Sequence, residues 1–331
     1  MNKSSSGNGL RGKPLASRRA LLGAVAALSL AATAARAEDV IHFGMTVQGN
    51  AIYAPLQAAE ELGYYKDAGL KVDFATYRGA TAGLEAMSAG AVDIVGALAA
   101  GAALAISKGA ECRIVYAMSE RPYGLYLEVK PDSPIKTMKD MAGKRVAISA
   151  SGGLSDLVTL WAADRAGVKV QLVPVGAGAM LPTWQAGRVE GIPIWPGISL
   201  RLISKGEGRP IVDFGQEMDV IYPDTLIASN ALIKARPDAL RRFIGAVDKA
   251  LTHMQNDPSF ALQFLKSYTE ETDDTVNKLV YEQVTLKQRA GGGINSADLK
   301  NGMRIAGKAW GIEDLNNVDP SAIYTFVSKE K

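Results

Sequence analysis

The 331-residue sequence is poor in the residues that most catalytic and metal sites require. It has a single cysteine, Cys112, and two histidines, His42 and His253, which lie far apart in the chain. One cysteine cannot form an internal disulfide or a thiolate cluster, and so few histidines argue against a zinc site. We expect Cys112 to be a buried, inert thiol, His42 to be a core or subsite residue of the first strand, and His253 to be structural.

Recognisable catalytic motifs are also missing from the sequence. It has no serine nucleophile elbow, no zinc-protease motif and no phosphate-binding loop of the Gly-x-x-x-x-Gly-Lys type. The segment starting at Gly176 begins like a dinucleotide fingerprint, but Leu181 occupies its third glycine position. We therefore predict no catalytic residues, no cofactor and no enzymatic activity.

The net charge is small once the beginning of the chain is set aside. The first 37 positions hold six of the 37 Lys and Arg residues and no Asp or Glu. The rest of the chain has 31 basic against 34 acidic residues, a net charge of −3. A weakly acidic body lacks the basic footprint of a nucleic-acid-binding protein, so we expect no nucleic-acid partner.

Residues 1–37 have the pattern of an export signal. A basic stretch is followed by the apolar run Leu21–Leu30, which is too short to span a bilayer, and by the small-x-small cleavage site Ala35–Ala37. Cleavage after Ala37 would release the mature protein into the periplasm. The pair Arg18-Arg19 resembles a twin-arginine signal, and an ordinary secretory signal is the alternative.

Beyond this segment, short apolar stretches alternate with helical patterns. The alternation runs from residue 41 to 118 and restarts from 123 to 195, and the segments beginning at Gly79 and Gly176 are similar to each other. Such alternation predicts parallel sheets with helices on both faces. After one more strand at Thr225–Ser229, nearly all of the chain has helical character.

This organisation predicts an α/β protein with two lobes of similar build. We expect residues 38–128 to form the first part of lobe 1 and residues 129–223 to form lobe 2. Residues 224–331 contain too little strand for a third sheet, so we expect them to pack back onto lobe 1.

Glycine-rich, small and polar loops follow the expected strands, at the edge where open parallel sheets bind ligands. Several of them lead into helices, so backbone N–H groups and positive helix ends would converge on an anion such as a sulfonate, carboxylate or phosphate. Each loop alone could be a turn that needs glycine for its backbone, but the mirrored set favours a binding cleft. The candidate contacts are Gln48, Asn50 and Tyr53, then Arg78, Gly79, Ala80 and Thr81, then Ser151 and Gly152, and finally Gly176.

Two aromatic residues and one cation complete the candidate site. Trp195 or Tyr222 would give apolar contact, although Trp195 could instead pack between lobes, and Arg78 would be the counter-ion unless it is solvated. Hydrogen bonds to a charged group contribute about 1.5–3 kcal/mol each. Three or four of them with such a contact could reach the roughly −8 kcal/mol of a micromolar ligand.

Four segments of the sequence carry a family resemblance, namely Tyr53–Val72, Ala89–Ile94, Ser133–Val146 and Ile233–Asp238. They resemble periplasmic solute-binding proteins of the nitrate/sulfonate/taurine type, which serve ABC importers. The resemblance implies a type II periplasmic-binding-protein fold, with two doubly wound α/β lobes joined by two crossover strands and a ligand cleft between them. It implies ligand contacts at Gln48, Asn50, Gly79, Ala80, Thr81, Ser151, Gly152 and Trp195, and a second crossover near Tyr222.

One departure from that family bears on the ligand. Where sulfonate-binding members have polar side chains, this chain has the apolar loop Gly96–Ala100. An apolar wall favours a ligand with a hydrophobic or aromatic body beside its anion. We therefore predict a monomer that captures a small organic anion by lobe closure and delivers it to an inner-membrane ABC permease.

Two other classes remain open at this stage. One is an enzyme similar to the fungal thiamine-pyrimidine synthases, or a pyrimidine-precursor-binding protein of the same superfamily; the single cysteine and the export signal argue against the enzyme. The other is a ligand-sensing receptor partner, which would differ only in its docking surfaces.

Overall fold

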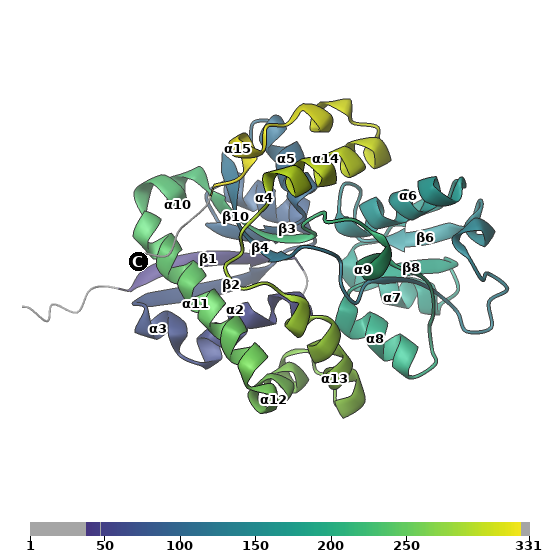
Figure 1. The fold of residues 1–331 in the computed structure, drawn as a ribbon, viewed down its shortest axis with the longest axis horizontal. Helices are drawn as coiled ribbons and strands as arrows, with labels where there is room; N and C mark the ends of the chain where they lie inside the picture. The colour runs from purple at the N-terminus through teal and green to yellow at the C-terminus, as the bar shows by residue number, and fades with distance from the viewer. Residues whose placement is uncertain (1–37, 47, 326–331) are drawn as a thin grey trace, which may run out of the picture. The chain divides into compact units, whose positions relative to one another are not determined.

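Two five-stranded sheets organise the computed structural model, which describes residues 38–46 and 48–325 (Figure 1). The first sheet has the order β2-β1-β3-β10-β4 and the second the order β7-β6-β8-β5-β9. The strands of the first sheet are β1 (Asp39–Met45), β2 (Leu70–Thr76), β3 (Ile94–Ala97), β4 (Cys112–Ser119) and β10 (Asp224–Ser229). Those of the second are β5 (Tyr126–Val129), β6 (Arg145–Ile148), β7 (Gln171–Pro174), β8 (Gly191–Ile194) and β9 (Arg209–Asp213).

Helices connect most of these strands. In the first half of the chain they are α2 (Ala54–Glu61), α3 (Tyr64–Asp67), α4 (Ala80–Ser88), α5 (Ala99–Ser107), α6 (Leu154–Ala166), α7 (Ala177–Gln185), α8 (Pro196–Ser204) and α9 (Phe214–Glu217). The remainder are α10 (Asn230–Ala235), α11 (Pro237–Asn256), α12 (Pro258–Tyr268), α13 (Asp274–Gln283), α14 (Ser296–Trp310) and α15 (Pro320–Ile323). Short 3-10 turns occur at η1 (Ala51–Tyr53), η2 (Met138–Met141), η3 (Thr285–Lys287) and η4 (Glu313–Asn317).

The prediction of parallel sheets holds for four strands of each sheet, and the fifth strand of each runs in the opposite direction. Strand β10 runs antiparallel to β3 and β4, and β5 runs antiparallel to β8 and β9. In sequence, β5 follows a strand of the first sheet and β10 follows a strand of the second. A strand that enters from the other sheet makes no helical crossover within its own sheet, which is the connection that keeps neighbours parallel.

Most expected elements are confirmed with small shifts in their bounds. The helical pattern that begins at Asp273 or Asp274 continues in the sequence to Arg289, but helix α13 ends at Gln283 and the 3-10 turn η3 follows the buried Val284. The sequence offers Asn230 and Ser296 as cap residues, but the structure places each cap one position earlier. Ser229 and Asn295 cap α10 and α14, since their side-chain oxygens accept backbone N–H groups of the first turn. The sequence patterns missed α8 and β9.

The amphipathic helix α11 buries one face against the first sheet. Phe243 of this helix stacks on Tyr65 of α3, with ring centroids 5.5 Å apart, and on Phe43 of β1 at 6.1 Å. Pro237 occupies the first position of α11, where its missing N–H has no intrahelical partner in any case. The helical tail that follows β10 thus supplies a large part of the core beneath this sheet.

His42 and Cys112 have opposite outcomes. His42 is exposed, with its ring 3.8 Å from Asp73, so the expectation of a core or subsite histidine is wrong. Its neighbours Ile41 and Phe43 are buried, and the period-two alternation of a strand turns His42 outward. Cys112 is buried as expected, and burial raises the pKa of its thiol to about 11.

The described residues from Asp39 onward form one compact unit. The expected lobe boundaries at 128/129 and 223/224 stay a prediction, and the expected export signal lies outside the described residues. Within the described part of the chain, none of the helices combines the length and the apolar character needed to cross a membrane.

A buried carboxyl on β5 should make stability depend on pH. Glu128 is fully buried; Ser199 Oγ donates to its Oε1, and no hydrogen-bond partner reaches Oε2. Burial raises the pKa of Glu128 to about 8. Between the ordinary glutamate pKa and pH 8, the folded state therefore keeps a proton on Glu128 that the unfolded chain has released. The free energy of unfolding falls as pH rises through this range.

We expect Glu128→Gln to flatten this dependence. Between pH 5 and pH 8 the free energy of unfolding of the wild-type protein should fall by up to about 1.4 kcal/mol per pH unit more than that of the variant. Denaturant titrations at several pH values measure the difference, with Glu313→Gln on the exposed η4 as the control. Parallel pH profiles of wild type and Glu128→Gln would contradict the assignment.

Candidate ligand-binding site

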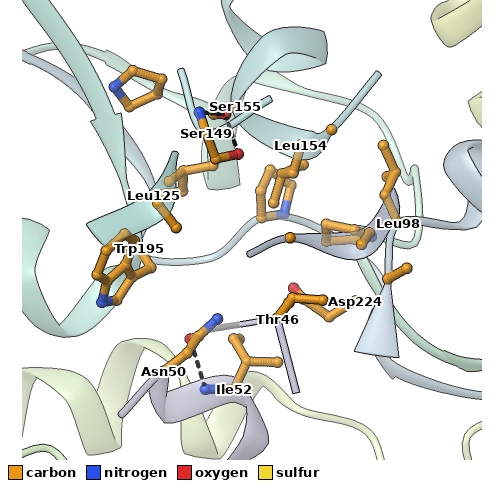
Figure 2. A pocket seen from close by; sticks show the side chains of 18 of the residues that line it. Thr46, Asn50, Ile52, Leu98, Leu125, Ser149, Leu154, Ser155, Trp195 and Asp224 are labelled. Carbon is orange, nitrogen blue, oxygen red and sulfur yellow. Dashed lines mark hydrogen bonds between the residues drawn. The ribbon is translucent and has the colours of Figure 1, made fainter. Parts of the chain in front are cut away.

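A pocket of about 140 Å³ is lined by residues from segments of both sheets. Figure 2 shows Thr46, Asn50 and Asp224 on one wall and Ser149, Leu154 and Ser155 on the opposite wall, with Trp195 at one side and Leu98 at the other. The first-sheet segments contribute Thr46, Asn50, Ile52, Tyr53, Gly79, Ala80, Ala97, Leu98, Gly101, Pro223 and Asp224. The segments of the second sheet contribute Leu125, Ser149, Gly152, Gly153, Leu154, Ser155, Ala177, Met180, Pro193, Trp195 and Pro196.

The helices that begin at this pocket lack side-chain caps. Their N-cap residues accept no hydrogen bond from the first turn, in contrast to the Asp, Ser and Asn caps of α9, α10, α12, α13, α14 and α15. The uncapped helices at the pocket are α4, α5, α6, α7 and α8, whose N-caps are Gly79, Leu98, Gly153, Gly176 and Trp195. Helices α2, α3 and α11 also lack a side-chain cap, and the N-caps of α3 and α11 lie outside the pocket lining.

Not all of the first N–H groups of the helices at the pocket are free: Ala99 N–H of α5 donates to Tyr222 O at 3.1 Å, Gly152 N–H before α6 donates to Asp156 Oδ2 at 2.6 Å, and α8 begins with Pro196, which has no N–H. The first turns of α4, α6 and α7 and the positive ends of these helices are the main backbone donors at the pocket.

Asn50 adds an oriented side-chain donor. Its Oδ1 accepts from the backbone N–H of Ile52 at 3.2 Å, and Tyr268 Oη donates to its backbone oxygen at 3.1 Å. The contact to Ile52 leaves the amide nitrogen of Asn50 directed toward the pocket (Figure 2). On the other wall, Ser155 Oγ accepts from the Ser149 backbone N–H at 2.9 Å and lies 3.0 Å from Ser149 Oγ.

Asp224 is the ionisable acid among the lining residues, and no Lys, Arg or His of the described chain lines the pocket. Ser119 Oγ donates to Asp224 Oδ2 at 3.3 Å, and Tyr53 Oη also hydrogen-bonds to this carboxyl group. Burial raises the pKa of Asp224 to about 6, and burial likewise raises the pKa of Tyr53 well above its ordinary value. At pH 7 the pocket therefore contains a carboxylate that no cation neutralises.

Apolar side chains form much of the remaining surface. Ala97 and Leu98 line the pocket, so the expected apolar wall after β3 is present. Leu125, Met180 and Trp195 extend this apolar surface on the side of the second sheet. The pocket thus combines backbone donors, one carboxylate and room for a hydrophobic group.

Half of the predicted site residues meet in this pocket, namely Asn50, Tyr53, Gly79, Ala80, Gly152 and Trp195. The structure places the other half outside the lining, namely Gln48, Arg78, Thr81, Ser151, Gly176 and Tyr222.

Three of the residues outside the lining have clear physical reasons for their positions. The Arg78 side chain is exposed, one residue before the N-cap of α4. Tyr222 is fully buried with φ 47°, and its hydroxyl accepts from Asn295 N–H at 2.8 Å, which directs the ring into the core. Gln48 lines a second cavity with Arg201 and Glu271, on the other side of Trp195.

Sequence reasoning missed several lining residues. Thr46 and Ser149 are the first residues of two of the polar loops that follow the expected strands, but neither was chosen as a contact, and Ser155 lies two residues beyond the second of these loops. Asp224 directly precedes the expected strand at Thr225, and a lone acid at a crossover gives a weak signal. Its burial and its contact with Tyr53 become visible only once β10 lies between β3 and β4.

The sheet orders, the two reversed strands and the pocket between the sheets define the architecture of a periplasmic binding protein. A family model described as NMT1/THI5 like matches residues 50–261. This match covers more than half of the chain, and the protein belongs to the NMT1/THI5-like family. A curated relative, YtlA of Bacillus subtilis (strain 168), is 22% identical over 229 residues, which are 67% of this chain and 68% of YtlA.

Solved structures confirm the predicted fold. The alkanesulfonate-binding protein SsuA from Xanthomonas axonopodis pv. citri, bound to MOPS, matches with a TM-score of 0.73 at 16% identity, covering 87% of this chain and 98% of that chain. The periplasmic aliphatic sulphonate binding protein SsuA from Escherichia coli matches with a TM-score of 0.69 at 18% identity, covering 88% and 94%. A desulfurization enzyme, DSZB, in complex with biphenyl-2-sulfinic acid, has a TM-score of 0.60 at 17% identity, covering 86% and 95%.

Space at Gly96 holds Tyr53 beside Asp224, and this contact can be tested. A Cβ added at Gly96 would lie 2.6 Å from Tyr53 Cε1 and Oη. We expect Gly96→Ala to displace the ring and to destabilise the fold by about 1–3 kcal/mol, the usual effect of overpacking. Denaturant unfolding measures the change.

Gly245→Ala is the matched control. Gly245 lies in the middle of α11, and a Cβ added there would have no atom within 4 Å. The substitution should leave stability unchanged or raise it slightly. Equal stabilities of Gly96→Ala and Gly245→Ala would show that Tyr53 does not depend on the space at Gly96.

Proposed function

We propose that the protein is the substrate-binding component of an ABC importer and that it captures a small organic anion by closure of its two lobes. The observation that carries this proposal is the convergence of uncapped helix N-termini on one pocket. Backbone N–H groups held there would hydrogen-bond a sulfonate or carboxylate without any lysine or arginine. Asn50, Ser149 and Ser155 supply polar contacts from the two opposite walls.

The remaining surface favours a ligand with a hydrophobic body. Ala97, Leu98, Leu125 and Trp195 would surround a ring or a short alkyl chain. The volume of about 140 Å³ resembles that of an engineered protein cavity that holds one benzene ring. We infer an arenesulfonate, an arene carboxylate or an alkanesulfonate of similar size.

Localisation and partners follow from the same proposal. The signal expected at residues 1–37 would place the mature protein in a periplasm, where a monomer delivers its ligand to an inner-membrane permease. Bending in the two segments that connect the sheets, residues 120–125 and 214–223, would open and close the pocket.

Binding without chemistry is favoured over catalysis. Cys112, the single cysteine, is buried and lies outside the pocket lining, and no group of three or more His, Cys, Asp or Glu in the described residues could hold a metal. The pyrimidine precursor left open in the sequence analysis is the second candidate ligand. A neutral pyrimidine would leave the helix N-termini without an anion.

Ligand class can be tested by isothermal titration calorimetry on the chain from Glu38 onward. We expect micromolar binding of benzenesulfonate or benzoate, and weaker binding of taurine and nitrate, which cannot fill the apolar part of the pocket. A pyrimidine alcohol belongs in the same panel. Tightest binding of nitrate, or of the pyrimidine alone, would refute the proposed ligand class.

The role of the helix ends can be tested at the first residue of α4. Ala80→Pro removes one N–H at a position where a helix tolerates proline. If this N–H binds the anion, affinity should fall by about 1.5–3 kcal/mol. Ala80→Gly, which keeps the N–H, is the control, and equal affinities of the two variants would exclude this donor.

The predicted counter-ion is checked in the same assay. Because the Arg78 side chain is exposed, water and salt screen its charge, and Arg78→Ala should cost less than about 1 kcal/mol. A loss as large as that of Ala80→Pro would restore Arg78 as a direct contact.

A further inference from the structure

One feature of the pocket does not fit a simple anion. Asp224 is 8% exposed and lines the same volume as the uncapped helix ends. A carboxylate offers about four acceptor positions, and Tyr53 and Ser119 use two of them. Figure 2 shows the Asp224 side chain beside Thr46 at the pocket wall, across from Ser149 and Ser155.

Nothing in the described surroundings neutralises this carboxylate. The groups facing it are the Tyr53 hydroxyl from η1 and the Ser119 hydroxyl from β4, while β3 and α5 present Ala97 and Leu98. Leaving a charge in such a place is costly unless a donor pairs with it. An anionic ligand group placed next to Asp224 would add repulsion to that cost.

We propose that the ligand carries a hydrogen-bond donor, an amino or ring N–H group, in addition to its anion, and that Asp224 accepts this hydrogen bond. The inference rests on the proposed function and narrows its ligand class to anions with an N–H group at the opposite end. The anion would lie at the N-termini of α4, α6 and α7 beside Ser149 and Ser155, and the donor would point at Asp224. The hydrophobic body would span the distance between them, along Leu98 and Trp195.

The test uses arenesulfonates that differ in one group. 3-Aminobenzenesulfonate and 4-aminobenzenesulfonate carry the donor, 4-methylbenzenesulfonate has nearly the same shape without it, and benzenesulfonate lacks both substituents. At pH 8 we expect wild type to bind at least one amino compound about tenfold more tightly than the methyl compound, the gain of one hydrogen bond to a charged group. The ratio should shrink at pH 5, where Asp224 is protonated.

Asp224→Asn should bring the amino-to-methyl ratio close to one at both pH values, whereas Asp314→Asn, an exposed acid on η4, should keep the wild-type ratio. A melting curve checks that Asp224→Asn is folded. If it is not, the wild-type ratio and its pH dependence decide.

The outcomes that would contradict the inference can be told apart. If wild type binds the methyl compound at least as tightly as both amino compounds, the donor inference is wrong and the proposed function stands. A preference that persists unchanged in folded Asp224→Asn also refutes it. If none of these sulfonates binds, the proposed ligand class fails, and the inference fails with it.

Discussion

Unsatisfied N–H groups at helix ends are the constraint on which the rest of this site depends. The first turn of every helix leaves backbone donors without an intrahelical partner, and most soluble helices satisfy them with a side chain or with water. Here the helices around the pocket begin at glycine, leucine or tryptophan, and the helices that begin elsewhere in the second half of the chain carry mostly Asp, Ser or Asn caps. The absence of caps at one place concentrates donors there. Closing the pocket without a ligand would leave these donors unpaired and away from water, which costs free energy. Closure is therefore favoured when a ligand is bound.

The two reversed strands explain how one chain places these ends around a single volume. A sheet of βαβ units directs its helix N-termini to the edge at the carboxyl ends of its strands. Strands β5 and β10 run the other way, each bringing the chain back from the opposite sheet. The amino-terminal ends of these two strands therefore lie at the edge where the parallel strands have their carboxyl ends, which is the edge that faces the pocket. Asp224, the first residue of β10, reaches the pocket for this reason, and Glu128 of β5 is buried in the second sheet.

Local patterns identified the elements because each depends on a few neighbouring residues. The bounds of α6, α11 and α12 follow from glycine, proline and apolar spacing, and the glycine-rich loops before α4, α6 and α7 do lead into helices. The direction in which a side chain points depends on residues far away in sequence. Tyr222 turns into the core because Asn295 offers it a partner, and His42 faces solvent because Ile41 and Phe43 occupy the buried face. Arg78 illustrates the same limit, since nothing local distinguishes a loop arginine at the cleft from one in solvent.

Charge balance gives the final step of the argument about specificity. Helix ends supply partial positive charge without the long, flexible side chains of lysine and arginine, so an anion bound there loses little side-chain entropy from the protein. A site built only in this way would accept any anion of suitable size. The carboxylate of Asp224 would make the site selective among anions. It repels a second negative group of the ligand and stabilises a hydrogen-bond donor at one fixed place. Tyr53 hydrogen-bonds to this carboxyl group and packs against Gly96, so the position of the carboxylate depends on a contact between β3 and η1. In this proposal the helix ends provide the affinity for the anion, and Asp224 determines which anions bind.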